Sequence, residues 1–345
     1  MSDERSDHLI GPDGQPRYGI FQTTPTVINV GDFNYRTPTH GRQLPGRKWL
    51  DYKQFQYIGV ISDNLLLGCA LGDFRYIGLA FVYTYEPATG TLTEFSTKLP
   101  LGRGISLTNR PLDGTGEFNS GGNRIRITAD IHPRVVTLDV HLKSGLTANV
   151  SFDLDDDPVF QPMSVCTQIA RHGWVFTQKI AGVACRGTVT GPFGQIDLAE
   201  VGAYAHYDYS VGYMRRETFW NWACFAGNAD GQAIGLNLSC GVNETSYSEN
   251  CFWVDGVLHP VGLATFDYDR RDPSSRAWHV STADGAIALD FVPEGIHVEK
   301  VNAFLIVSDF KQLFGRFSGT IRTHDGTTIE ITDQYGFVED QYSKW

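Results

Sequence analysis

The sequence has little positive charge. Its 345 residues include 28 Lys and Arg against 39 Asp and Glu, a formal net charge of -11. Nucleic acids and anionic membranes bind clustered Lys and Arg, so neither partner is expected. The chain contains no run of about 18 apolar residues that could span a bilayer, and its first residues contain no apolar segment typical of a secretion signal. We therefore expect a cytoplasmic protein with no integral membrane segment.

The sequence also lacks the spacings that mark metal sites and common cofactor sites. Its six cysteines are far apart and its histidines form no short pairs, so we expect mostly buried thiols and no metal. There is no G-x-S-x-G elbow, no P-loop and no G-x-G-x-x-G fingerprint opening a helix, which argues against serine hydrolases, NTPases and dinucleotide enzymes. We expect no cofactor.

Helical periodicity is almost absent, and alternating strands take its place. Residues 124–128, 137–142 and 149–154 alternate polar with apolar side chains, the period of a half-buried strand. Asp255-Gly256 and Asp325-Gly326 are typical of tight hairpins. Only Phe310 to Phe314 is interpreted as a helical turn. These patterns predict an all-β protein built as antiparallel barrels or sandwiches.

A short phrase occurs twice in the chain. Gly187-Thr188-Val189 with Gly194 recurs as Gly319-Thr320-Ile321 with Gly326, and Tyr209-Ser210 is matched by Tyr342-Ser343. The phrase predicts two similar β-domains in tandem, with chance as the alternative because Gly and Thr are common in strands and turns. We assign residues 1–45 to an N-terminal arm, 46–205 to the first domain and 206–345 to the second. Pockets favour such domain junctions, so a ligand site is expected near the boundary.

The densest cluster of candidate site residues begins at Asp208. If residues 216–223 form a strand, Arg216, Thr218, Trp220 and Trp222 share one face and could form the wall of a pocket. The alternative is that the tryptophans fill a barrel interior. Asp208 is a candidate acid, although its place shortly before a glycine also suits a turn.

The second cluster runs from Ser248 to Gly256. Period two places Glu249 and Trp253 on one face. A carboxylate beside a large aromatic can have its pKa raised by desolvation and can then donate a proton near neutral pH. An exposed rim position for Glu249 is the alternative. Asn250 is a candidate for substrate binding.

Two further residues complete the predicted site. Asn237 stands between Leu236 and Leu238, where a buried amide could orient a ligand oxygen, although it could equally face solvent. His206 is included because it lies two residues before Asp208.

Several segments together resemble a large bacterial family of unknown function. They are Lys48-Trp49 through Tyr52, residues 76–83, Asp208-x-x-x-Gly212, Thr218-x-Trp220-Asn221-Trp222, residues 235–238, Glu249-Asn250, Asp255-Gly256 and residues 314–319. That family is more remotely similar to a lipocalin-like superfamily containing carotenoid 1,2-hydratase, kievitone hydratase and fungal decalin-forming cyclases. The resemblance implies two lipocalin-like barrels in tandem, with a hydrophobic ligand near their junction.

These observations lead to three functional hypotheses. The first is a hydratase, dehydratase, isomerase or cyclase that acts without a cofactor on a terpenoid-like or phenolic molecule. Asp208 and Glu249 would be its acids, Trp220, Trp222 and Trp253 its cation-stabilising rings, and Arg216 and Asn237 would hold a polar head group. The second is a non-catalytic carrier of a lipid or terpenoid. A carbohydrate-active enzyme is the third. A homodimer is a candidate assembly.

Overall fold

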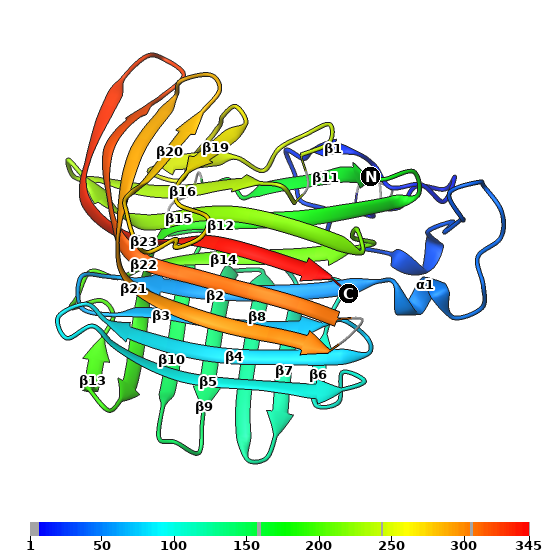
Figure 1. Ribbon diagram of the computed structural model, residues 1–345, viewed down its shortest axis with the longest axis horizontal. Helices are drawn as coiled ribbons and strands as arrows, with labels where there is room; N and C mark the ends of the chain where they lie inside the picture. The colour runs from blue at the N-terminus through cyan, green and yellow to red at the C-terminus, as the bar shows by residue number, and fades with distance from the viewer. Residues whose placement is uncertain (1–6, 157–159, 243, 304–305, 345) are drawn as a thin grey trace.

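The computed structural model describes residues 7–156, 160–242, 244–303 and 306–344. These residues form two curled antiparallel sheets, which make two lipocalin-like barrels in tandem (Figure 1). Among them, helical structure is limited to η1 (Val30–Asp32) and α1 (Arg47–Leu50). No helix in this part of the chain is long and apolar enough to cross a membrane. The predicted all-β class is confirmed.

The first sheet is built from the N-terminal strands. Its path runs β5-β4-β3-β2-β14-β12-β10-β9-β8-β7-β6, and β1, β11 and β13 pair off this path. In Figure 1, β2 to β5 lie across β7 to β10, which form the opposite wall. The bounds are β1 (Gly19–Ile20), β2 (Lys53–Ile61), β3 (Leu66–Asp73), β4 (Ile77–Glu86), β5 (Thr91–Pro100), β6 (Ile105–Leu107), β7 (Gly114–Ser120), β8 (Asn123–Ile131), β9 (Arg134–His141), β10 (Thr147–Asp153), β11 (Met163–Ile169), β12 (Gly173–Gly191), β13 (Gly194–Asp197) and β14 (Tyr204–Gly212).

The second sheet repeats the same order of connections. It runs β18-β17-β16-β15-β23-β22-β21-β20-β19. Its first and last strands in chain order, β15 and β23, therefore pair with each other, as β2 and β14 do in the first sheet. The bounds are β15 (Glu217–Ala229), β16 (Gln232–Cys240), β17 (Cys251–Val254), β18 (Val257–Pro260), β19 (Ala264–Asp267), β20 (Trp278–Thr282), β21 (Ile287–Ala303), β22 (Ile306–Arg322) and β23 (Thr328–Lys344).

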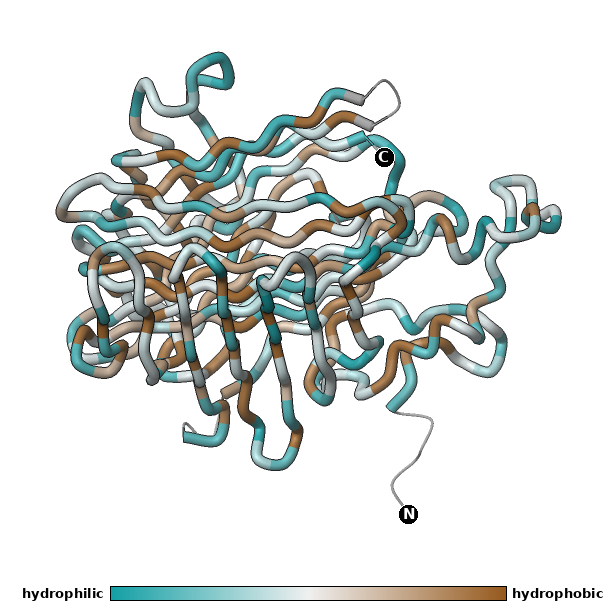
Figure 2. Tube along the Cα trace, turned by 90° about the horizontal axis from the view of Figure 1, so that it is seen from below, coloured by the Kyte–Doolittle hydropathy of each residue, from teal (hydrophilic) through white to brown (hydrophobic). Residues whose placement is uncertain are grey.

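Alternation of side chains explains why these segments form curled sheets with one face buried. In β8, Ile125 and Ile127 are buried while Arg124 and Arg126 are exposed, which agrees with the period of two in the sequence. The same alternation between hydrophobic and hydrophilic residues is visible along many strands in Figure 2. One hydrophobic core fills the first barrel and extends across the junction to Trp222 and Phe337, and a second core fills the other barrel.

The repeated phrase occupies matching places in the two sheets. Gly187 in β12 and Gly319 in β22 both have positive φ, at 115° and 140°. A Cβ at Gly187 would lie 2.0 Å from the carbonyl oxygen of Asn149, and one at Gly319 would lie 2.3 Å from that of Ala288. Only glycine avoids these contacts with the neighbouring strand. The duplicated glycines therefore perform one structural task in two copies of a barrel.

The two sheets come into close contact where two glycines face each other. A Cβ on Gly235 in β16 would lie 2.1 Å from the carbonyl oxygen of Ala181 in β12, and one on Gly182 would lie 2.7 Å from the Gly235 nitrogen. The register of β12 against β14 also shifts between Ala181 and Val183. This bend brings the backbones of the two barrels into contact and fixes the junction beside Lys179.

The structure corrects one expectation and locates others. Phe310 to Phe314 is not a helical turn, because these residues pair along both edges within strand β22. Asp255-Gly256 forms the two-residue hairpin turn, with both φ angles positive. The sheets change between Gly212 and Glu217, beyond the boundary proposed at residue 205. In the proposed arm, β1 pairs with β11. All six cysteines are free thiols, and five of them are buried.

Candidate active site

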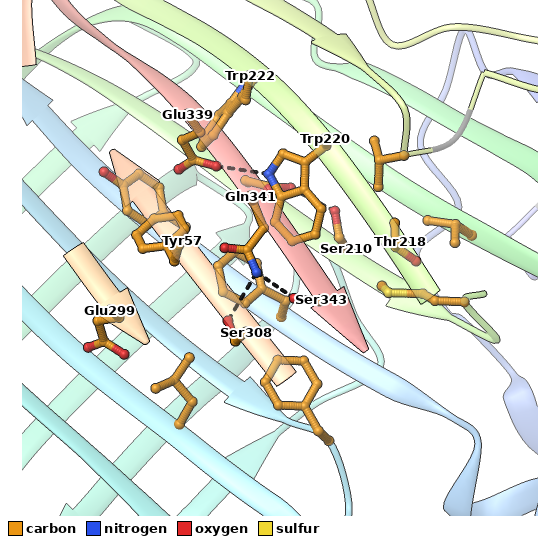
Figure 3. A pocket seen from close by; sticks show the side chains of 18 of the residues that line it. Tyr57, Ser210, Thr218, Trp220, Trp222, Glu299, Ser308, Glu339, Gln341 and Ser343 are labelled. Carbon is orange, nitrogen blue, oxygen red and sulfur yellow. Dashed lines mark hydrogen bonds between the residues drawn. The ribbon is translucent and has the colours of Figure 1, made fainter. Parts of the chain in front are cut away.

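A cavity of about 200 Å³ lies at the junction of the two sheets. Aromatic and aliphatic side chains form most of its wall, including Phe55 and Phe81 from the first sheet and Phe310 from the second. Figure 3 shows how Tyr57, Trp220 and Trp222 surround its polar groups. A mostly apolar cleft with a few convergent polar groups, placed between domains, is typical of a small-molecule site.

A buried lysine joins two of the predicted site residues. The Lys179 ammonium lies 2.7 Å from a carboxylate oxygen of Asp208 and 3.5 Å from one of Glu249. Asp208 and Glu249 are only 6% and 2% exposed, and both line the cavity. Burial alone would lower the pKa of Lys179, but Asp208 and Glu249 outweigh it and hold that pKa above its ordinary value. Lys179 is therefore a permanent cation at the cavity wall.

Asp208 sits in a network of hydroxyl groups. Ser210 donates a hydrogen bond to Asp208 Oδ1 at 2.8 Å, and Thr177 donates a longer one at 3.4 Å. Burial raises the pKa of Asp208 above its ordinary value, Lys179 opposes this rise, and Glu249 adds to it. Because Lys179 and Asp208 are directly opposite on β12 and β14, the sheet register itself fixes this ion pair.

The second sheet contributes a carboxyl group of a different kind. Glu339 lines the cavity and is 5% exposed. Trp220 Nε1 donates to its Oε2 at 2.9 Å, and Gln312 Nε2 donates to its Oε1 at 2.8 Å (Figure 3 shows the first). Burial raises the pKa of Glu339 to about 7, against the opposing influence of Trp220, Lys179 and Gln312. A substantial share of Glu339 is therefore a neutral carboxylic acid near pH 7.

Trp222 connects Lys179 to Asn237. The Lys179 ammonium lies 4.6 Å from the ring centroid of Trp222, within the range of a cation–π contact. Trp222 Nε1 donates to Asn237 Oδ1 at 2.8 Å, and Asn237 Nδ2 donates to the backbone oxygen of Glu249 at 2.9 Å. Asn237 therefore lies behind the cavity wall and holds Trp222 and Glu249 in place.

His206 also lies behind the wall. Its ring packs against Tyr57, Trp222 and Phe337, with centroid distances of 5.3, 6.3 and 5.2 Å. Burial, aided by Lys179, lowers the pKa of His206 to about 3. His206 is thus a neutral ring that supports two cavity aromatics.

The structure distributes the ten predicted site residues among several places. Asp208, Glu249, Thr218, Trp220 and Trp222 line the junction cavity together. Asn250 accepts a hydrogen bond from the Ser239 backbone nitrogen at 2.6 Å, and Trp253 donates to the Gln161 backbone oxygen at 2.7 Å; neither lines the cavity. Arg216 lies at a second, neighbouring cavity.

Sequence reasoning missed Lys179, Gln312 and Glu339. A signal for Lys179 existed, because it is a single lysine inside the otherwise uncharged run from Gly173 to Cys185. Glu339 could have been reached from Ser343 in steps of two, which place both residues on one face of a strand. No cluster of His, Cys, Asp and Glu suited to holding a metal ion occurs among the described residues.

The arrangement combines one carboxyl group with a pKa near 7, one buried cation and aromatic faces. A carboxylic acid near its pKa can both donate and accept a proton at neutral pH. The faces of Trp220, Trp222 and Tyr57 can stabilise positive charge that develops on a bound molecule. The site therefore suits proton-transfer chemistry on an apolar ligand.

The chain belongs to the family described as "Domain of unknown function (DUF2804)", whose model matches residues 4–345. No curated protein matches its sequence. Among solved structures, CghA with Sch210972 is similar with a TM-score of 0.57 at 11% identity, covering 94% of this chain and 98% of that one. Kievitone hydratase from Nectria haematococca has a TM-score of 0.52 at 11% identity, covering 84% and 89%. The family match confirms the predicted family of unknown function, and the structural likenesses show the shared fold.

Proposed function

We propose that this protein is a lyase- or isomerase-type enzyme, such as a hydratase, dehydratase or cyclase, that uses acid catalysis without a cofactor. Its substrate would be a terpenoid-like or phenolic small molecule held in the junction cavity. The observation that carries the proposal is Glu339, a buried carboxylic acid with a pKa raised to about 7 in an aromatic cavity. The fold shared with kievitone hydratase supports the same reaction class.

The proposed reaction begins with proton transfer from Glu339. Its carboxylic acid protonates an alkene carbon, or the oxygen of a hydroxyl that leaves as water, and the substrate becomes a carbocation. Trp220 and Trp222 stabilise that charge through their ring faces. Addition of water, or attack by a second double bond, is followed by loss of a proton, which returns to the Glu339 carboxylate.

Asp208 and Glu249 have a supporting part in this proposal. Their contacts with Lys179 place a fixed arrangement of charges beside Trp222. Preorganised charges in a poorly solvated site can stabilise a developing charge without reorganising. We propose that the two carboxylates stabilise the carbocation electrostatically, while the proton lost at the end of the reaction returns to Glu339.

One feature, the set of buried carboxyl groups, favours catalysis over simple carriage of a ligand. A carrier needs an apolar lining but has no use for buried carboxyl groups, because each such group costs stability unless it is compensated. In this protein Asp208, Glu249 and Glu339 all line the cavity and are nearly inaccessible.

The test begins with identification of a ligand. Native mass spectrometry of freshly purified protein, followed by extraction, gives a compound or compound class to assay. We expect Glu339→Gln to lower kcat on that compound by about 10²- to 10⁴-fold, the usual contribution of a general acid. Glu330→Gln is the matched control, because Glu330 is an exposed carboxylate on the same strand. Turnover by Glu339→Gln within a few-fold of the wild type would refute the proposal.

A further inference from the structure

A second cavity, of about 480 Å³, is lined by an unusual number of cations. Six basic residues surround it, and the single carboxylate among its lining residues, Asp51, is paired with Arg47 at 2.8 Å. The six come from four separate segments: Arg36 and Arg47, Lys53, Arg171, and Arg215 with Arg216. In a chain whose net charge is -11, this concentration of positive charge marks a site for an anion.

Two contacts at this cavity involve its positive charge. His172 Nε2 and His40 Nδ1 lie 3.1 Å apart, and burial, His40, Arg171 and Arg36 together lower the pKa of His172. The Lys53 ammonium lies 4.3 Å from the ring centroid of Tyr76, which also lines the cavity. A bound anion would relieve the repulsion among the cations that line this cavity.

Lys53 provides a second, independent indication of an anion. It is 5% exposed, and its ammonium donates to the backbone oxygens of Leu50 and Phe74, both at 2.9 Å. An ammonium has three N–H donors, and among the described residues these two oxygens are its only hydrogen-bond acceptors. Burial lowers the pKa of Lys53 to about 8. Asp51 and Asp73 oppose this lowering, but each is already paired with an arginine, so an anion in the cavity would compensate the buried ammonium further.

The cationic cavity adjoins the junction cavity. Tyr76, Ile169, Met214 and Arg215 line both. A molecule that reaches from one cavity into the other would place its apolar part among the aromatic side chains and its end among the cations. The two cavities thus match the two parts of an amphiphile.

We infer that the cationic cavity binds an oxyanion head group, a carboxylate or a phosphate, of a substrate whose apolar part occupies the junction cavity. This inference rests on the proposed function and names the substrate class for that site. Arginine matches both head groups, because its planar guanidinium can donate two parallel hydrogen bonds to carboxylate or phosphate oxygens. The head group would also fix which carbon of the apolar part lies beside Glu339.

Binding of three ligands that share one ten-carbon alkyl chain tests the inference. Decanoate, decyl phosphate and 1-decanol differ only in their head groups, and isothermal titration calorimetry gives Kd for each at low and at high salt. We expect at least one of the anionic ligands to bind about tenfold or more tightly than the alcohol, the usual effect of a hydrogen bond to a charged group. High salt should reduce this preference. The tighter of the two anions identifies the head group.

Two variants test whether the cationic cavity causes the preference for the anion. Arg171→Gln combined with Arg216→Gln should remove most of the preference for the anion, because both residues line the cationic cavity. Arg124→Gln is the matched control, since Arg124 is exposed on β8 and lines neither cavity. Equal affinity of the wild type for alcohol and anions, or an anion preference that survives the double substitution, would overturn the inference.

A third variant separates this inference from the proposed function. Glu339→Gln should keep the preference for the anionic ligand, because that preference depends on the cationic cavity and requires no turnover. If Glu339→Gln is inactive while the wild type shows no preference among the three ligands, the inference fails and the proposed function stands. If the preference is present but Glu339→Gln is fully active, the inference about binding stands and the proposed chemistry fails.

Discussion

Each barrel places a buried carboxyl group on its last strand, opposite a polar residue of the neighbouring strand, but the two partners differ. In the first, Asp208 on β14 is directly opposite Lys179 on β12. In the second, Glu339 on β23 is directly opposite Gln312 on β22. The first pair is an ion pair at 2.7 Å, and the second is a hydrogen bond from a neutral amide at 2.8 Å. Both carboxyl groups line the same cavity.

The comparison shows how one duplicated architecture can produce two chemical roles. An ammonium opposite the carboxylate stabilises its charged form, whereas an amide compensates much less of the cost of burying a charge. Burial raises the pKa of both carboxyl groups, but in the first pair the Lys179 ammonium opposes this rise directly, and in the second the pKa of Glu339 is raised to about 7. A cross-strand pair on the last strand of each barrel thus has a different charge environment in the two barrels, and the proposed function uses this difference.

The largest expected difference between the two pairs is in stability. Lys179→Met leaves Asp208 and Glu249 buried without their cation, so we expect a loss of about 3–5 kcal/mol in the free energy of unfolding. Gln312→Met removes one hydrogen bond to an acid that can be neutral, for which about 1–3 kcal/mol is expected. Urea denaturation followed by tryptophan fluorescence measures both values. Equal losses in the two variants would contradict the electrostatic contrast between the barrels.

The second prediction concerns the pH dependence of stability. The ordinary pKa of a glutamate is 4.5, and that of Glu339 in the folded protein is about 7. The folded state therefore binds a proton that the unfolded state releases. The stabilisation from Glu339 is complete below pH 4.5, declines as pH rises to about 7, and is absent above it.

We expect Glu339→Gln to remove this decline. Between pH 4.5 and pH 7 the free energy of unfolding of the wild type should fall relative to that of the variant by on the order of 3 kcal/mol. Glu330→Gln, on the exposed face of β23, should follow the wild type. Parallel pH profiles for Glu339→Gln and the wild type would mean that Glu339 is ionised throughout this range.

The smallest expected effect tests the likeness of the barrels. Gly187→Ala and Gly319→Ala should each lower the free energy of unfolding by about 1–3 kcal/mol, since each new Cβ would press on a carbonyl oxygen of the next strand. Similar losses would support one shared structural task. Gly31→Ala is the control, because a Cβ there meets no atom within 4 Å. If either repeat substitution were as mild as the control, the two glycines would not be equivalent.

Much of the fold could be predicted from the sequence because its signals are local. Alternation in residues 124–128 and the Asp255-Gly256 turn depend on neighbouring residues, and the duplicated glycine phrase reveals the repeat. Phe310 to Phe314 was misinterpreted because its spacing of aromatic residues also suits a helix. In the folded protein Phe310 and Phe314 pack against Phe81 and Tyr83 of the first sheet, a contact that local spacing does not contain.

The site could be predicted only in part because its charges are set by register across strands. Asp208 and the tryptophans were found through their position in one dense segment. The pairing of Lys179 with Asp208 depends on which residues lie opposite each other on β12 and β14. The raised pKa of Glu339 likewise depends on burial between segments that are distant in sequence, and it is only partly opposed by the hydrogen bonds that Trp220 and Gln312 donate. Alternation predicts on which face of a strand a side chain lies, but it does not predict which residue of the neighbouring strand lies opposite.

The central claim is that the pKa of Glu339 is raised to about 7, so that this carboxyl group is partly neutral at neutral pH. Carbon-13 NMR of protein labelled at the glutamate side-chain carboxyl carbon can follow its titration, with Glu339→Gln used to assign the resonance. The account predicts a midpoint near pH 7 for Glu339. A midpoint at or below 4.5 would show an ionised glutamate at neutral pH and would contradict the claim.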